Sequence, residues 1–295
     1  MRKYLALVLI LFVLLCALKT ADSSSKKLYG FCYGPFRDGQ NPGGVYPTRD
    51  QIKEDLWLLK KYTRRIRTYS VEKVLGKIPK LAKKAKLKCY AGAWIDGDPH
   101  WNKREIRRLI ATSENAHALV VGNEVLLRET LPESDLISLI RKVRRRTNLP
   151  VGYADTWDEW LNHPKVAVEV DFLLVNIHPY WGGLPVENAA QDVNKIWSEA
   201  YDTYSRNGGK PVLIGETGWP SRGEVEGDAV PSRANQCKFL RRFYKSASQN
   251  SIPYFYFEAF DEKWKRTETG TEVEAHWGLF RSNRTWKPCV KRFFD

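Results

Sequence analysis

Two glutamates stand out in the sequence because each follows a run of apolar residues. Glu124 ends LVVGNE and Glu216 ends VLIGE. A carboxylate buried in such a run without a partner costs on the order of several kcal/mol, so we expect a functional role for both. Two carboxylates that face each other about 5 Å apart are what retaining glycoside hydrolysis requires, since one attacks the anomeric carbon and the other protonates the departing oxygen. The charge of the first also raises the pKa of the second and keeps its proton available near neutral pH.

Two other roles for these acids follow from the same positions. Glu124 and Glu216 could be structural acids that form ion pairs with Arg67 or Lys265, and barrel enzymes also gather carboxylates around metal ions. The five histidines show no H-x-x-x-H or H-E-x-x-H spacing, which disfavours a zinc hydrolase. We therefore expect neither a metal nor a cofactor, and we expect His178 and His276 to donate hydrogen bonds within the wall of the site.

The elements that must position these residues are eight apolar runs of strand length separated by segments of helical periodicity. The runs begin at Leu28, Arg65, Lys88, Ala118, Pro150, Phe172, Pro211 and Pro253. Their starts are about 32 residues apart, which is typical of the βα repeat of a barrel of this size. The pattern predicts a single (β/α)8 TIM barrel, with a doubly wound open sheet as the alternative, although the glycine fingerprint of such a sheet is absent.

Amphipathic patterns predict helices between these strands. They cover residues 51–62, 132–146, 186–206, 231–248 and 287–294, whereas 156–171 is short and interrupted by Pro164. Thr48 and Gln51 have the spacing of a capping box. Glu124 then ends the fourth strand and Glu216 the seventh, so both lie at the carboxyl ends of strands, where barrel enzymes carry their chemistry.

Several longer segments resemble glycoside hydrolase family 17, the β-1,3-glucanase family of the retaining barrel clan. They are YGFCYGPFRDGQNP, IRTYS, VVGNEVLLR, VNIHPYW, IGETGWPS, FEAFDEKWK and EAHWGLF, and the likeness runs from Tyr29 to Phe280. The resemblance implies that Glu124 is the acid/base and Glu216 the nucleophile. It also implies that Asn123 bonds the sugar 2-hydroxyl.

The resemblance implies further contacts with the substrate. Glu274 and Lys265 resemble the accessory acid and lysine of the family, and Tyr33 and Tyr180 resemble its mouth tyrosines. For Glu258, a hydrogen-bonded acid of the core is as good an interpretation as a functional one.

Tryptophans are concentrated at or just after the predicted strand ends, at positions 94, 101, 157, 181, 219, 264 and 277. Their rings could stack on glucose or fill the core. We expect Trp181, Trp219 and Trp264 to be sugar platforms.

Residues 1–21 have a positive start, the apolar run 5–18 and a small polar end, which is typical of a secretory signal peptide with cleavage near 21–23. Residues 22–295 would be one catalytic domain, secreted or extracytoplasmic in the periplasm or cell wall, and a membrane-anchored form is the alternative. In such a compartment Cys237 and Cys289, on the last two predicted helices, could form a disulfide.

The net charge of +14 suggests that part of the surface of the molecule could bind an anionic partner. The lysine-rich stretch 77–88 and the arginines at 141 and 144–146 could be solvated helix faces or a patch that attracts an anionic wall polymer, phospholipid or acidic glycan of the cell envelope. The absence of base-stacking or helix-turn-helix motifs argues against nucleic acid as a partner.

The sequence thus predicts a monomeric, retaining, endo-1,3-β-glucanase-like hydrolase that works by double displacement and whose partner is a β-glucan polysaccharide or oligosaccharide. The alternatives are a β-1,3-glucanosyltransferase, an exo-acting β-1,3-glucosidase and, from another class, a non-catalytic glycan-binding protein of the cell wall.

Overall fold

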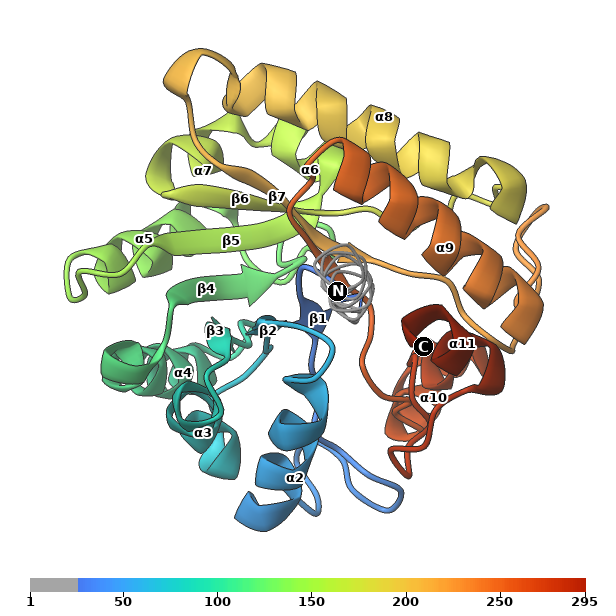
Figure 1. The fold of residues 1–295 in the computed structure, drawn as a ribbon. Coiled ribbons are helices and arrows are strands. Elements are labelled where there is room, and N and C mark those ends of the chain that lie inside the picture. Colours follow the sequence, from blue (N-terminus) through green and yellow to red (C-terminus); the bar gives the residue numbers. More distant parts are fainter. Residues whose placement is uncertain (1–25) are drawn as a thin grey trace, which may run out of the picture.

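Eight parallel strands form a closed barrel in the order of the sequence (Figure 1). The first strand pairs with the last through Phe31 and Tyr256. The computed structural model describes residues 26–295, so the predicted signal peptide and its cleavage site lie outside the described residues. The strands are β1 (Phe31–Cys32), β2 (Arg65–Arg67), β3 (Lys88–Ala93), β4 (Ala118–Asn123), β5 (Val151–Thr156), β6 (Phe172–Asn176), β7 (Val212–Thr217) and β8 (Tyr254–Tyr256). The predicted (β/α)8 barrel is therefore confirmed, and the closed ring excludes the open sheet.

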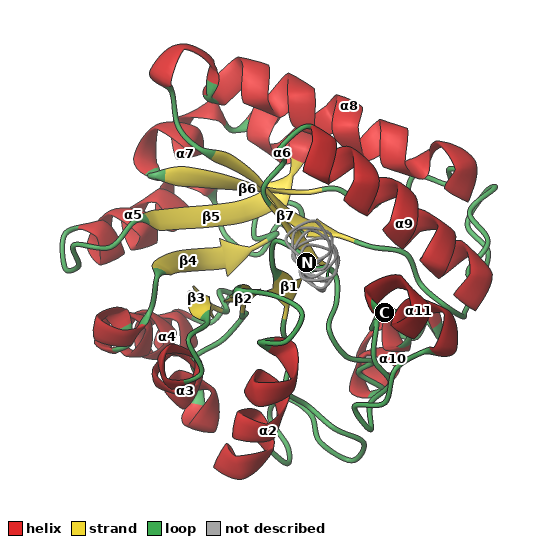
Figure 2. Cartoon of the chain, viewed as in Figure 1, coloured by secondary structure: helices red, strands yellow, loops and turns green. Residues whose placement is uncertain are grey.

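Helices surround the strands as an outer layer (Figure 2). They are α2 (Arg49–Leu59), α3 (Ile78–Lys84), α4 (Pro99–Ala111), α5 (Glu133–Arg144), α6 (Trp157–Asn162), α7 (Pro164–Glu169), α8 (Val186–Tyr204), α9 (Arg233–Gln249), α10 (Trp264–Thr269) and α11 (Pro288–Phe294). Short 3-10 turns lie at Lys73–Lys77, Ser113–Asn115, Arg206–Gly208 and Val273–Ala275. Within residues 26–295 no helix combines the length and the apolar character that crossing a bilayer requires.

Local sequence explains where several helices begin. The capping box is present at α2, where the side chain of Thr48 accepts from the N–H of Gln51 and the side chain of Gln51 accepts from the N–H of Thr48. The segment 156–171 forms two short helices, because Pro164 lacks the N–H that a continuous helix needs and instead starts α7.

Three shifts in strand register occur where β4, β6, β7 and β8 approach the carboxyl end of the barrel. They fall between Val120 and Asn123, at Val175–Asn176, and between Ile214 and Thr217. Such irregularities turn side chains to a new direction. Gly122 adopts φ 88°, a conformation that favours glycine, and it lies directly before Asn123 and Glu124.

The predicted disulfide is present between Cys237 of α9 and Cys289 of α11, whose Cα atoms are 6.2 Å apart. It fastens the last helix of the ring to its neighbour.

The arginines on the outer face of α5 are exposed, and Arg141 and Arg144 form ion pairs with Glu169 and Asp171.

Candidate active site

A cavity of about 1020 Å³ opens at the carboxyl ends of the strands. Among the predicted site residues it is lined by Tyr33, Asn123, Glu124, Trp181, Glu216, Trp264, Lys265 and Glu274. Residues far apart in the sequence are thus brought to one mouth by the closure of the barrel. No three His, Cys, Asp or Glu side chains of residues 26–295 converge in the manner of metal ligands.

Glu216 is buried at the end of β7 and has three polar partners. Its Oε1 accepts from Nη1 of Arg67 at 3.1 Å and from the hydroxyl of Tyr69 at 2.8 Å, and its Oε2 lies 3.2 Å from Nε2 of His178. Burial alone would raise the pKa of this carboxyl, but the positive charge of Arg67 and the bonds from His178 and Tyr69 hold the pKa of Glu216 below its usual value. Glu216 is therefore ionised at neutral pH.

Glu124 follows β4 and has no cationic partner among the described residues. Its Oε1 accepts from Nδ2 of Asn176 at 2.7 Å. Burial and, next, the negative charge of Glu216 raise the pKa of Glu124 to about 7. The carboxyl group thus keeps a proton for much of the range in which Glu216 is ionised.

A buried polar chain joins the two glutamates. Asn176 donates to Glu124, its Oδ1 lies 3.4 Å from Nη1 of Arg67, and the same nitrogen contacts Glu216. Asn123 completes the chain, because its Oδ1 accepts from Asn176 at 3.1 Å and from Nη2 of Arg67 at 2.5 Å. This leaves the Nδ2 of Asn123 as its donor toward a ligand. The ion pair that we considered between Arg67 and one of the two glutamates is present with Glu216 and not with Glu124.

Tyr69 and Asn176 contact the two glutamates, and sequence reasoning did not single them out. Tyr69 stands in the segment IRTYS after β2, and Asn176 in VNIHPYW at the end of β6. The signal was available, because both are polar residues at the carboxyl end of a strand. His178, in contrast, was expected in the wall and contacts Glu216 there.

Lys265, Glu258 and Glu262 form a second charged group beside the cavity. The Nζ of Lys265 lies 2.6 Å from Oε2 of Glu258 and 3.1 Å from Oε2 of Glu262. Burial and then the charge of Glu262 raise the pKa of Glu258, although the adjacent charge of Lys265 lowers it. One oxygen of Glu258 has no hydrogen-bond partner in residues 26–295, so the expectation of a fully bonded core acid is not met. Glu274 lines the cavity, and burial raises its pKa.

Trp219 and Tyr180 are placed differently from their prediction. Trp219 has none of its surface exposed, lies outside the cavity lining, and donates its N–H to the carbonyl of Val230. The turn after β7 carries its ring back against Phe239 of α9, where it fills the core. Tyr180 is likewise fully buried and donates to the carbonyl of Glu224. Neither residue can stack on or bond a sugar in this structure.

Trp181 and Trp264 do face the cavity. Trp181 is 44% exposed and Trp264 begins α10 at its edge. Further tryptophans of the lining are Trp94, Trp101, Trp157 and Trp277. The concentration of tryptophan after the strand ends therefore does build the cavity wall. His276 is not part of it, since its Nε2 contacts Glu272 at 2.9 Å outside the lining.

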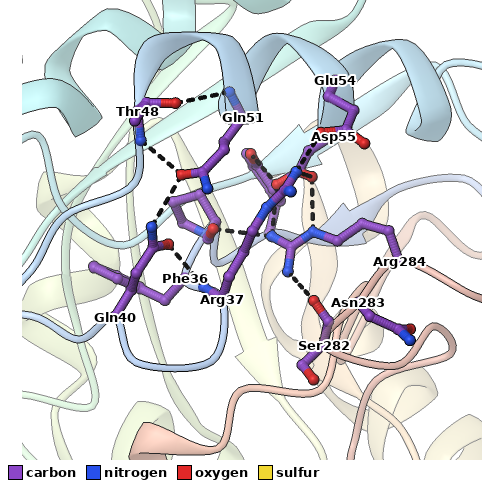
Figure 3. A network of polar contacts seen from close by, with 12 residues as sticks. Phe36, Arg37, Gln40, Thr48, Gln51, Glu54, Asp55, Ser282, Asn283 and Arg284 are labelled. Atoms are coloured by element: carbon purple, nitrogen blue, oxygen red, sulfur yellow. Dashed lines mark hydrogen bonds and ion pairs between the residues drawn. The ribbon is translucent and has the colours of Figure 1, made fainter.

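Tyr33 lines the cavity but its hydroxyl points to a structural acid. It donates to Oδ2 of Asp55 at 3.1 Å, and Asp55 is fully buried. Figure 3 shows Arg284 and Arg37 converging on this carboxylate. Arg284 donates to both of its oxygens, at 2.8 and 2.7 Å. The network ties the loop after β1 to α2 and to the C-terminal segment, and it fixes one wall of the cavity.

Comparison with known proteins places this site in a family. Residues 30–278 match the family described as the BtgE/BtgC glycoside hydrolase domain. The chain is 30% identical over 278 residues to glucan endo-1,3-beta-glucosidase btgC of Emericella nidulans, which covers 83% of this chain and 42% of that protein. It is 29% identical over 293 residues to a glucan 1,3-beta-glucosidase of Schizosaccharomyces pombe, with 92% and 88% covered. The chain spans about 40% of the length of the btgC relatives that it matches first.

A solved structure shows the same relationship at the level of the fold. The glycoside hydrolase family 17 beta-1,3-glucanosyltransferase from Rhizomucor miehei superposes with a TM-score of 0.77 at 32% identity, covering 89% of this chain and 96% of that one. An active-site mutant of that protein, 31% identical with the same TM-score and coverage, was solved in complex with laminaritriose. The chain belongs to the BtgE/BtgC glycoside hydrolase domain family and, with the Rhizomucor protein, to glycoside hydrolase family 17.

Proposed function

We propose that the chain is a retaining β-1,3-glucan hydrolase in which Glu216 is the nucleophile and Glu124 the acid/base. The observation that carries this proposal is the pair of neighbouring glutamates whose pKa values move in opposite directions, to about 7 for Glu124 and below the usual value for Glu216. Two carboxyl groups with separate protonation states are what an acid and a nucleophile need at one pH.

In the first step, the ionised carboxylate of Glu216 attacks the anomeric carbon of the sugar. The bond to the glycosidic oxygen breaks, and the proton of Glu124 passes to that oxygen as the leaving group departs. Because Oε1 of Glu124 accepts from Asn176, the proton resides on Oε2. Arg67, Tyr69 and His178 keep Glu216 ionised but do not themselves attack the sugar.

In the second step, the glycosyl ester on Glu216 is broken by water. Esterification removes the charge of Glu216, which lowers the pKa of Glu124, and Glu124 then takes a proton from the attacking water. The water oxygen bonds the anomeric carbon, and the carboxylate of Glu216 is released. Two inversions at the same carbon give net retention.

The substrate assignment rests on the cavity wall and the relatives. Trp181 and Trp264 offer large rings to the apolar faces of glucose, and we propose that the free Nδ2 of Asn123 donates to the 2-hydroxyl. Lys265 and Glu274 are proposed to bond hydroxyls of neighbouring sugar units. The printed names of the relatives concern β-1,3-glucan, which supports the same linkage here. We propose, too, that the domain acts as a monomer that is secreted or extracytoplasmic, with a membrane-anchored form as the alternative.

Transfer to a second sugar is the other candidate activity, and the Rhizomucor relative is named for it. The chemistry is the same until the ester on Glu216 forms, after which a glucan hydroxyl replaces water. The products of laminarin oligomers of defined length distinguish the outcomes: shorter chains alone mean hydrolysis, and chains longer than the substrate mean transfer.

The glycan-binding alternative is tested by Glu216→Ala. We expect turnover of laminarin oligomers to be abolished while their binding remains measurable. Binding without turnover by the wild-type chain would favour the non-catalytic role, and unchanged turnover by the variant would refute the proposed nucleophile.

A further inference from the structure

The two ends of the barrel carry opposite charge. The cavity at the carboxyl end is lined by eight acidic side chains and a single lysine, Lys265. The acids are Glu72, Glu124, Asp158, Asp192, Glu216, Glu262, Glu268 and Glu274. The net positive charge of the chain must therefore be carried by other surfaces.

Much of it gathers where β1, β2 and β3 begin. We define the basic end as the cluster Lys27, Lys60, Lys61, Arg64, Arg65, Lys86 and Lys88. Backbone pairing holds these residues together. Leu28 forms a parallel β-bridge with Thr63, and Arg65 pairs in register with Lys88. The N–H of Lys88 donates to the carbonyl of Arg64 at 2.9 Å. Parallel strands all start at one end of a barrel, so these residues lie opposite the cavity.

Within residues 26–295 no acidic side chain forms an ion pair with the basic end. Lys61, Arg64 and Lys88 are exposed. Residues 59–65 and 85–93 contain neither Asp nor Glu. Burial and then the charges of Lys88 and Arg65 lower the pKa of the adjacent His117, which reports the same positive field.

Helix stabilisation accounts for only part of this cluster. Lys60 directly follows α2, where a cation interacts favourably with the negative end of the helix dipole. Arg64, Arg65 and Lys88 lie at the start of strands, where no helix end needs them. Like charges this close, without counter-charges, indicate a surface that meets an anionic partner.

The chain also enters the barrel at this end. The N–H of Leu28 donates to the carbonyl of Tyr62 at 2.9 Å, next to Lys61. In the sequence, seven residues separate the apolar run 5–18 from Lys26. Seven extended residues span at most about 25 Å. A chain that keeps this run therefore holds it within reach of the basic end.

We propose that the basic end docks on an anionic phospholipid bilayer and directs the acidic cavity away from the membrane. The partner needs only a flat array of negative charge, since the contact consists of the cations of the basic end and the adjacent exposed Trp57. The Nζ of Lys60 lies 3.2 Å from the centre of the Trp57 ring. An anionic polymer would be repelled by the acidic side chains of the cavity, whereas an anionic surface would be attracted by the basic end. The exposed Trp57 beside these cations favours lipid over a soluble polyanion, because an amphipathic ring suits a membrane interface, and in a chain that keeps the apolar run 5–18 that run favours lipid as well.

The test is sedimentation of the domain 22–295, which contains every described element, with vesicles of phosphatidylcholine alone or with phosphatidylglycerol. The triple variant Lys61→Gln, Arg64→Gln, Lys88→Gln should bind the anionic vesicles about 100-fold more weakly, since each cation near such a surface contributes about fivefold. Wild-type binding should also fall as salt rises.

The matched control is Lys103→Gln, Arg233→Gln, Arg241→Gln, which removes the same charge from exposed positions on α4 and α9. It should bind almost as wild type. Equal loss in both triples, or equal binding to neutral vesicles, would overturn the proposal. So would tight binding to heparin under conditions in which anionic vesicles are not bound, because the partner would then be a soluble polyanion.

Orientation has its own readout, which does not depend on activity. Cys32 and Cys89 are buried and Cys237 and Cys289 are bridged, so an introduced surface thiol can be labelled selectively. A fluorophore at Ala111→Cys, at the end of α4 nearest the membrane, should be quenched by a lipid-borne quencher. A fluorophore at Thr269→Cys on the cavity rim should not, and the reverse pattern would contradict the docking geometry.

Discussion

The side chain of Asn176 donates a hydrogen bond from Nδ2 to Oε1 of Glu124 at 2.7 Å. The bond has two consequences for an acid/base catalyst. It turns the second oxygen of Glu124 into the proton carrier, and it lowers the pKa of Glu124 against the upward pull of burial and of Glu216.

Asn176→Ala therefore moves two quantities. We expect kcat to fall about 100-fold, because the carboxyl group loses its orientation. We also expect the alkaline limb of kcat/KM to move to higher pH, since the pKa of Glu124 rises when the bond is lost and the active acid is the form present below that pKa. The pH–rate profile on a laminarin oligomer measures both. A lower rate with an unshifted limb would limit Asn176 to packing.

Tyr69 controls the other limb of the profile. Its hydroxyl bonds Glu216 at 2.8 Å and lowers the pKa of that carboxyl. In Tyr69→Phe we expect the acid limb to move up by about one to two units, since a hydrogen bond to a charged group is worth about 1.5–3 kcal/mol and the active nucleophile is the ionised form. Tyr33→Phe is the matched control, because the hydroxyl of Tyr33 bonds Asp55 instead. An equal shift in both variants would contradict this assignment.

The two glutamates should also sense each other directly. The charge of Glu216 is the second largest cause of the raised pKa of Glu124, after burial. In Glu216→Gln, the pKa of Glu124 should fall below about 7 yet stay above that of an ordinary glutamate, because its burial is unchanged. Carbon-detected NMR titration of labelled glutamates measures this value in the inactive variant. An unchanged pKa would mean that the carboxyl groups are too far apart to interact.

Replacing Trp219 should lower the stability of the fold, whereas replacing Trp181 should weaken substrate binding. Trp219→Ala removes a fully buried ring and should cost about 3–5 kcal/mol of unfolding free energy. Trp181→Ala removes a ring that is 44% exposed on the cavity wall, so KM should rise roughly five- to tenfold with little change in stability. Denaturant titration and initial rates provide the two readouts, and a large stability loss in Trp181→Ala would count against its role as a platform.

The contrast between these two tryptophans shows what sequence could predict. The number and spacing of apolar runs predicted the barrel, because buried parallel strands have nearly continuous apolar runs. The same runs placed Glu124 and Glu216 at strand ends. The direction in which a side chain leaves such an end is not encoded in this way, since it depends on register shifts and on the path of the following turn. Trp219, turned back against Phe239, was mistaken for a platform for that reason.

Tyr69 and Asn176 were missed for a related reason. Each is a polar residue within a segment that was already recognised as family-like, but its partner lies on a distant strand. The contact of Tyr69 with Glu216 spans 147 positions and that of Asn176 with Glu124 spans 52. Only the closed barrel brings such pairs together. The position of each residue at a strand end could be read from the sequence, but its partner could not.

Trapping of the glycosyl ester tests the central claim most directly. A 2-deoxy-2-fluoro laminaribioside with a good leaving group should form the ester quickly and release it slowly, because fluorine at carbon 2 destabilises the oxocarbenium-like transition state. Mass spectrometry of the digested domain should then find the sugar on the peptide that contains Glu216, and Glu216→Gln should remain unlabelled. A sugar on another carboxylate, or product of inverted configuration with no labelled peptide, would contradict the account.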